Sequence, residues 1–208
     1  QDFKQIVLHP DRLEQPLRWR KPRRIFVNSM SDIFHEKVPD QFIFDILKIM
    51  VATGQHLYQV LTKRPERMAS VVPEMYKSFR YHFDAPGPET PLRNLWLGVS
   101  CENQQYADER IPWLLKTPAA VRFLSLEPLL GPIDLTTTLA GIAFGGTIRW
   151  LDWVIVGGES GGPSERALIY KYKAQRKDLI HFPSEWWMPK PEPLEWIRSI
   201  RDQCVAAG

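Results

Sequence analysis

The sequence predicts an α/β fold in which parallel strands alternate with helices and build part of a (βα) barrel. Five short apolar runs recur at about the spacing of one βα unit, and a polar or charged group closes each run. The runs begin at Arg24, Leu57, Leu95, Val121 and Leu151. Parallel strands that are covered on both faces read as continuous apolar runs, and their carboxyl ends meet at one edge of a sheet. The polar groups that close the runs should therefore share one rim.

Helical patterns fill the intervals between these strands. The clearest helix is expected over residues 38–53, because Pro39 suits its first turn and Gly54 suits the position after its last turn. A second helix is expected after Pro65. Pro73 should limit or break it, because proline lacks the amide hydrogen that a helix interior needs.

The second half of the chain holds two more helical stretches. One is expected around residues 103–116, interrupted or kinked at Pro112, and the other is an amphipathic helix over residues 193–207. Residues 129–150 contain four glycines and one proline, which predicts a loop with short helical pieces.

Five βα units are too few to close an eight-stranded barrel. We prefer a partial barrel that has lost one strand at each end to a doubly wound sheet. An open doubly wound sheet binds its ligand at one switch point, whereas polar groups close all of these runs. We expect a single domain over residues 1–208 that is truncated at both ends, since the chain starts at Gln1 and stops at Gly208, where a strand should follow a helix.

The composition is that of an ordinary globular protein with a mild excess of positive charge. The chain has 208 residues, a net charge of +3 and a pI near 8.9, which is compatible with an anionic or nucleic-acid ligand. No apolar stretch approaches the ~20 residues of a membrane span and no signal peptide is visible, so we expect a cytoplasmic protein without a membrane partner. Cys101 and Cys204 are too far apart in the sequence to predict a disulfide framework or a metal site.

The groups that close the runs are the candidate site residues. They are Ser31, Asp32, Lys63, Ser100, Glu102, Glu127 and Glu159. Glu127 stands in an apolar setting, so we expect its carboxylate to be partly buried beside a donor or a cation. Lys63 and Arg64 would either balance the acids or bind a carboxylate or phosphate of a substrate.

Two features of the sequence are also compatible with other kinds of ligand. The four acids at the strand ends could together hold a divalent metal, because hard cations prefer several carboxylate oxygens. These acids are Asp32, Glu102, Glu127 and Glu159. The stretch from Arg18 to Arg24 mixes basic residues with an aromatic residue, Trp19, a pattern that is compatible with nucleic-acid contact as well as with a solvated flank of a strand.

A serine hydrolase is a minor alternative. Gly158, Ser160 and Gly162 match the nucleophile elbow of that class. Only Asp178 and His181 follow in the order that the elbow requires, and they are three residues apart. The simpler interpretation is a tight glycine turn that lets a ligand approach the backbone.

Several sequence blocks are specific enough to suggest a family. They read IFVNSMSDIFH, YQVLTKRPERM, LWLGVSCEN, RFLSLEPLLGPI, LDWVIVGGESG and WIRSIRDQC. Through these blocks, residues 1–162 and 192–208 resemble a family of phage- and prophage-associated bacterial proteins of uncharacterised function with a three-cysteine motif near the N-terminus. We expect residues 163–191 to be an insertion or a divergent stretch.

The resemblance implies a TIM-barrel-like fold of the radical S-adenosylmethionine (SAM) type, similar to the spore-photoproduct-lyase-like branch. It implies two cofactors, SAM and a [4Fe–4S] cluster that three thiolates hold. These 208 residues contain no three-cysteine motif. The resemblance further implies that Glu127 and Glu159 lie toward the substrate, and that the remaining candidates hold the amino-acid and ribose parts of SAM. Those candidates are Ser31, Asp32, Lys63, Ser100 and Glu102.

The first functional hypothesis is therefore a radical-SAM-like enzyme that acts on an unidentified substrate, such as a nucleic acid or nucleotide. The second is a non-catalytic or metal-dependent barrel protein that binds nucleic acid or a partner protein. The two differ most directly in whether the protein has a three-cysteine motif upstream of Gln1.

Overall fold

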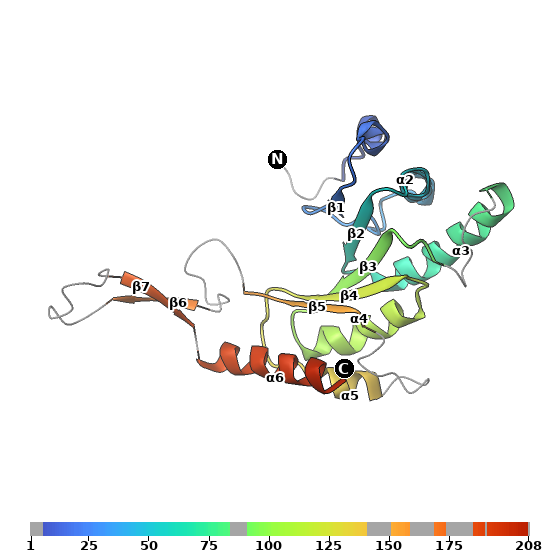
Figure 1. Ribbon diagram of the computed structural model, residues 1–208. Helices are drawn as coiled ribbons and strands as arrows, with labels where there is room; N and C mark the ends of the chain where they lie inside the picture. Colours follow the sequence, from blue (N-terminus) through green and yellow to red (C-terminus); the bar gives the residue numbers. More distant parts are fainter. Residues whose placement is uncertain are drawn as a thin grey trace.

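The centre of the molecule is a five-stranded, entirely parallel sheet in the order β1-β2-β3-β4-β5 (Figure 1). The computed structural model describes residues 6–83, 91–140, 151–158, 169–173, 185–189 and 191–207. The strands are β1 (Arg24–Val27), β2 (Leu57–Thr62), β3 (Leu95–Ser100), β4 (Val121–Leu126) and β5 (Trp153–Val156). The five predicted strands and their parallel direction are confirmed.

Each strand lies beside the strand that precedes it in the sequence, so the strand order never reverses. The crossovers are made by α2 (Asp40–Ala52), α3 (Pro65–Phe83) and α4 (Gln104–Lys116), and in Figure 1 these helices lie on one side of the curved sheet. A doubly wound sheet would carry helices on both faces. The arrangement is therefore consistent with a partial (βα) barrel.

Side-chain alternation explains why the helices cover this face. Val60 on β2 is in register with Leu97 on β3, and both are 1% exposed. Because side chains in neighbouring parallel strands point the same way at register positions, these residues form one apolar layer under the helices. Burial of each such side chain contributes about 1.5–3 kcal/mol, which makes this layer the main source of stability.

The opposite, concave face carries large aromatic side chains. Trp96 and Phe123 both contact Trp153, with ring centroids 6.2 Å and 5.8 Å apart respectively. The ring of Phe123 lies across Gly98 so closely that a Cβ there would be 2.6 Å from it. Trp153 is 42% exposed, so this face is open at β5.

Helices form where the sequence predicts α2 and α4, but the prediction that Pro73 limits or breaks α3 is wrong, and Pro112 does not interrupt α4. α3 continues through Pro73 to Phe83, and α4 likewise runs through Pro112. A proline inside a helix costs about 3 kcal/mol. The buried face of α3 outweighs this cost, since Met68, Val72 and Tyr76 are each 0% exposed and each contributes about 1.5–3 kcal/mol.

Shorter elements complete the described chain. Two short helices, α1 (Pro10–Leu13) and η1 (Gln15–Arg18), precede β1. α5 (Leu135–Ala140) is a short helix within residues 129–150, as predicted, while residues 141–150 lie outside the described part. Within residues 163–191, β6 (Ile169–Lys173) and β7 (Glu185–Pro189) form an antiparallel pair.

α6 (Pro191–Ala207) confirms the last predicted helix and begins two residues earlier than expected. Gln203 of α6 bonds to the segment before α5: its side-chain amide donates to the carbonyl of Ile133 and accepts from the amide of Leu135. Among the described residues, no helix has both the length and the apolar character that crossing a bilayer requires.

Candidate functional site

The loops that follow β1 and β2 are joined by the carboxylate of Asp32. Its Oδ1 accepts hydrogen bonds from the amide of Phe34 (2.9 Å) and the hydroxyl of Thr62 (2.9 Å), and its Oδ2 accepts from the amide of Lys63 (3.0 Å). The guanidinium of Arg64 lies 3.2 Å from the same Oδ2. Both oxygens are therefore engaged within the protein, and Asp32 fixes the backbone from which the Lys63 side chain extends.

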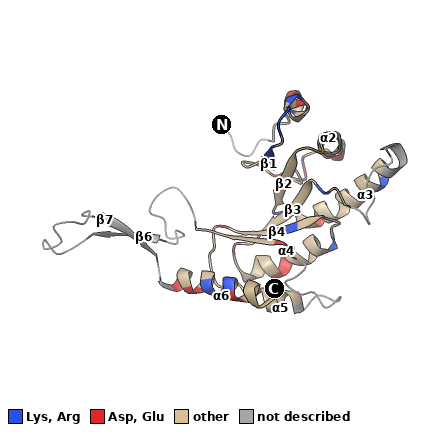
Figure 2. Ribbon diagram, in the orientation of Figure 1, with Lys and Arg blue, Asp and Glu red and all other residues tan. Residues whose placement is uncertain are grey.

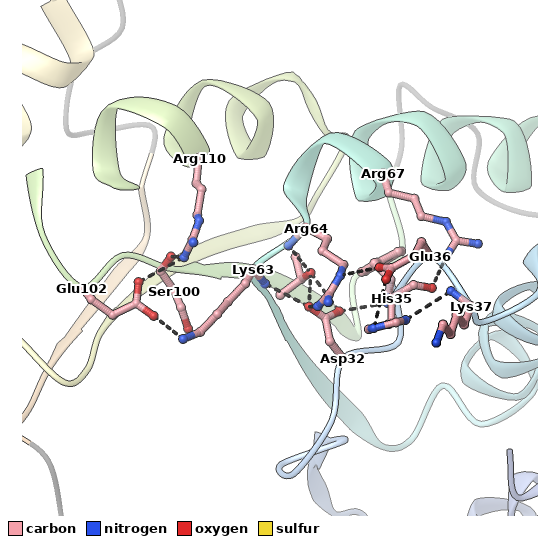
Figure 3. A network of polar contacts seen from close by, with 12 residues as sticks. Asp32, His35, Glu36, Lys37, Lys63, Arg64, Arg67, Ser100, Glu102 and Arg110 are labelled. Atoms are coloured by element: carbon pink, nitrogen blue, oxygen red, sulfur yellow. Dashed lines mark hydrogen bonds and ion pairs between the residues drawn. The ribbon is translucent and has the colours of Figure 1, made fainter. Parts of the chain in front are cut away.

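Lys63 and Arg110 hold the carboxylate of Glu102 from two sides (Figure 3). The Nζ of Lys63 donates to Oε1, while Nη1 of Arg110 donates to Oε2 at 3.1 Å and to the carbonyl of Ser100 at 2.8 Å. The side chains of Glu102 and Arg110 are 7% and 9% exposed, whereas that of Lys63 is 55% exposed. One partner of Glu102 is therefore fixed in the protein interior, and the other is free to move into solvent.

This arrangement keeps Glu102 ionised. Burial opposes ionisation, but the hydrogen bond and charge of Lys63, together with the charge of Arg110, outweigh it, so that the pKa of Glu102 lies below its ordinary value. A buried carboxylate needs such partners, because an isolated buried charge would be too costly. The side chain is therefore a stable anion at neutral pH.

Two nearly buried hydroxyls lie beside this group. Ser100 and Ser125 are register partners on β3 and β4 and are 5% and 6% exposed. Val99, which precedes Ser100, points toward the helices. Because side chains alternate along a strand, Ser100 and its register partner Ser125 point to the opposite, concave face. Neither hydroxyl forms a hydrogen bond to another described residue. Their donors and acceptors are thus available to a ligand at the rim.

Cys101, which follows Ser100, has a different character. It is 0% exposed, and burial raises the pKa of its thiol to about 12. A thiol in this state is protonated at neutral pH and is therefore a poor nucleophile. Cys101 therefore serves as a small buried side chain.

Ion pairs continue from Asp32 along the outer part of the rim (Figure 3). Arg64 bonds to Glu36 as well as to Asp32, and Arg67 donates to the carbonyls of His35 and Val38. The imidazole Nε2 of His35 lies 3.2 Å from Glu36. These contacts anchor the loop between β1 and α2 to the start of α3. Arg64 therefore balances the charges of Asp32 and Glu36, which agrees with one of the two interpretations of this residue from the sequence.

The other predicted site residues are less closely connected to this group. Ser31 is exposed, and its amide donates to the carbonyl of Asn28 in a turn after β1. Glu127 follows β4 and lies over Gly157, where a Cβ would be 2.9 Å from its carboxyl carbon. Glu159 lies outside the described residues.

The prediction that Glu127 is partly buried beside a donor or a cation is wrong. Glu127 is exposed and makes no ion pair or hydrogen bond with any residue that the structure describes. The preceding Leu126 is 0% exposed under the helices, so alternation turns Glu127 toward the open face. Gly157 has no side chain that would cover it.

The structure tests the alternative metal site but not the hydrolase site. No three His, Cys, Asp or Glu side chains within the described ranges come close enough to hold a metal ion. The proposed set of four acids is therefore not assembled there, although its fourth member, Glu159, is not described. The hydrolase elbow at Ser160, with Asp178 and His181, lies outside the described residues.

Sequence reasoning missed Arg110, and it found Ser125 at the end of the fourth run without assigning it to the site. Arg110 lies on the buried face of α4 together with Ala107, Ile111 and Leu114. A charged residue at an apolar position of an amphipathic helix is the signal that would have identified it. Ser125 closes an apolar strand in the same way as Ser100, so the rule that selected Ser100 applies to it as well.

Comparison with known proteins places the chain in one family. No curated protein and no solved structure matches it. A family model with the description "Protein of unknown function (DUF5131)" matches residues 1–180. This agrees with the expectation of an uncharacterised family. The match covers most of the chain, and the protein therefore belongs to the DUF5131 family.

Proposed function

We propose that this chain is the SAM-binding part of a radical-SAM-type enzyme, and that it binds the cofactor at the carboxyl ends of β2, β3 and β4. The observation that carries the proposal is the ionised Glu102 between Arg110 and Lys63, beside two hydroxyls without partners in the described structure. Parallel (βα) barrels bind their ligands at this end of the strands. The resemblance of the rim blocks to those of radical SAM proteins supports the choice of cofactor.

The chemistry of the rim matches the amino-acid part of SAM. That part carries an ammonium and a carboxylate, and the pair of Lys63 and Glu102 offers one charge to each. A carboxylate on the ligand would replace Glu102 as the partner of Lys63, because the Lys63 side chain is half-exposed and flexible. Glu102 would then keep its contact with Arg110 and present Oε1 to the ligand ammonium.

Ser100 and Ser125 match the sugar of the same cofactor. Ribose hydroxyls donate and accept hydrogen bonds, and so do serine hydroxyls. When bound, SAM would supply the reactive sulfonium, and the residues of this chain would supply its orientation and the exclusion of water. Glu127, exposed after β4, is the residue of this chain that we assign to the substrate side of the rim.

The cysteines of this chain do not fit a [4Fe–4S] cluster. A cluster of this kind needs three accessible thiolates. The chain has two cysteines: Cys101 is 0% exposed with a pKa of about 12, and Cys204 lies on α6, where burial also raises its pKa. We therefore assign no cluster ligand and no cluster-dependent step to these residues.

Isothermal titration of the protein with SAM tests the proposal. The account predicts saturable binding that Lys63→Ala and Glu102→Gln each weaken about tenfold or more, since each removes one charged contact. Glu102→Gln keeps an acceptor for Arg110 but removes the charge, so circular dichroism must show that this variant is folded before its affinity is compared. Lys77→Ala is the matched control, because Lys77 is 57% exposed and also pairs with a glutamate, but on α3.

The control should bind SAM with the affinity of the wild-type protein. Wild-type affinity in both site variants would remove this rim from the cofactor site. No detectable binding by a folded wild-type protein would overturn the proposed function itself.

A further inference from the structure

The positive charge of the chain is concentrated in one segment that the proposed cofactor site does not use. Between His9 and Arg24 there are six Lys and Arg and two Asp and Glu, a net charge of +4, against +3 for the whole chain. The rest of the protein is therefore slightly acidic. Figure 2 shows these cations along the segment that leads into β1. We call the six cations the basic surface: Arg12, Arg18, Arg20, Lys21, Arg23 and Arg24.

All six side chains belong to exposed residues, and none forms an ion pair with a described residue. This differs from the rim, where Lys63, Arg64 and Arg67 each bond to a carboxylate. Clustered cations without counter-charges repel one another, so their positions cost stability unless an anion binds. The basic surface therefore has the electrostatics of a site for a polyanion.

A buried histidine holds the segment in place. His56 is 1% exposed; its Nδ1 accepts from the amide of Arg23 (3.2 Å), and its Nε2 lies 3.0 Å from the carbonyl of Pro16, to which it donates. The guanidinium of Arg23 lies 4.5 Å above the ring of Trp19, whose edge contacts His56. Because these contacts hold the backbone at Pro16 and at Arg23, the stretch between them loses little backbone entropy when an anion binds.

We propose that the basic surface binds the phosphate backbone of a nucleic acid without selecting its base sequence. Five of its six cations are arginines, whose planar guanidinium can bond to two phosphate oxygens at once. Segments that lie on membranes are typically long amphipathic helices, whereas α1 and η1 have four residues each. These features favour a nucleic acid over an anionic membrane.

The basic surface is separate from the proposed cofactor site. Arg24 begins β1, whereas Lys63 follows the last residue of β2, and the two strands are parallel. The two groups therefore lie at opposite ends of the sheet. Loss of nucleic-acid binding and loss of SAM binding can be produced by different variants.

Fluorescence anisotropy with labelled oligonucleotides of about 20 nucleotides tests this inference, with single-stranded DNA, single-stranded RNA and duplex DNA as separate arms. At low salt we expect saturable binding that falls steeply as salt is raised. The variant Arg18→Ser/Arg20→Ser/Lys21→Ser should bind about tenfold or more weakly. Its logarithmic salt dependence on single strands should decrease by about 2, since ~0.7 counterions are released for each phosphate contact.

The control Lys37→Ser/Arg93→Ser/Arg198→Ser removes the same charge from three other exposed cations that have no ion pair in the described structure. It should bind like the wild-type protein, and circular dichroism should show both triple variants folded. An equal loss in both variants would mean that net charge alone attracts the nucleic acid. That result, the absence of binding at low salt, or binding to phosphatidylglycerol vesicles but not to oligonucleotides would overturn the inference.

Discussion

Arg110 is the single residue on which the candidate site depends most. It is buried, and it connects the backbone of β3 at Ser100 to the carboxylate of Glu102. Its guanidinium also lies 4.0 Å above the ring of Tyr106 on the same helix. Arg110 therefore fixes where Glu102 lies and, after Lys63, helps to keep it charged, without needing to touch a ligand itself.

Removal of this side chain should destabilise the protein. Arg110→Ala leaves Glu102 with one partner that is half in solvent, and loss of one member of a buried ion pair costs about 3–5 kcal/mol. Urea denaturation measures this free energy of unfolding. Arg201→Ala is the control, because Arg201 and Asp202 form a pair whose members are 63% and 64% exposed, and such pairs contribute about 0–1 kcal/mol. An equal, small effect of both substitutions would contradict the role given to Arg110.

At the scale of elements, the contact between β3 and β4 is set by a glycine. Phe123 on β4 extends across Gly98 on β3, where any side chain would meet its ring. Because of this close contact, the Phe123 ring covers the concave face of β3 just before Ser100 and Ser125. The concave face is thereby filled at β3 and β4, while the rim above it keeps its polar groups.

A methyl group at Gly98 should therefore disturb the sheet. A Cβ would be 2.6 Å from Phe123, and overpacking of this kind costs about 1–3 kcal/mol. Thermal unfolding of Gly98→Ala should show the loss, and Gly98→Ala/Phe123→Leu should recover part of it. Gly131→Ala is the control, since no atom lies within 4 Å of its Cβ position. Unchanged stability of Gly98→Ala would show that the ring moves aside freely.

At the scale of the whole molecule, the sequence predicted the sheet because apolar runs and their spacing reflect burial on both faces. It did not predict the continuity of α3, because the cost of Pro73 is local, whereas the burial of Met68 and Tyr76 that offsets it depends on tertiary packing. The exposure of Glu127 depends on its neighbour across the sheet, Gly157, which no local pattern reveals.

The candidate site was predicted in the same partial way. The rule that polar groups close parallel strands selected Lys63, Ser100 and Glu102, and the structure brings the three together through Arg110. The same rule also selected Asp32, although both of its carboxylate oxygens already accept hydrogen bonds within the protein. This engagement depends on hydrogen-bond partners distant in sequence, which spacing does not contain.

Hydrogen–deuterium exchange of the protein with and without SAM tests whether the cofactor binds at this rim, since it reports both binding and its location. The account predicts slower exchange of backbone amides at the ends of β2, β3 and β4, in segments that contain Lys63, Glu102 and Ser125, with no change in α6. Unchanged exchange in all three segments at a saturating concentration of SAM, or protection confined to α6, would contradict it.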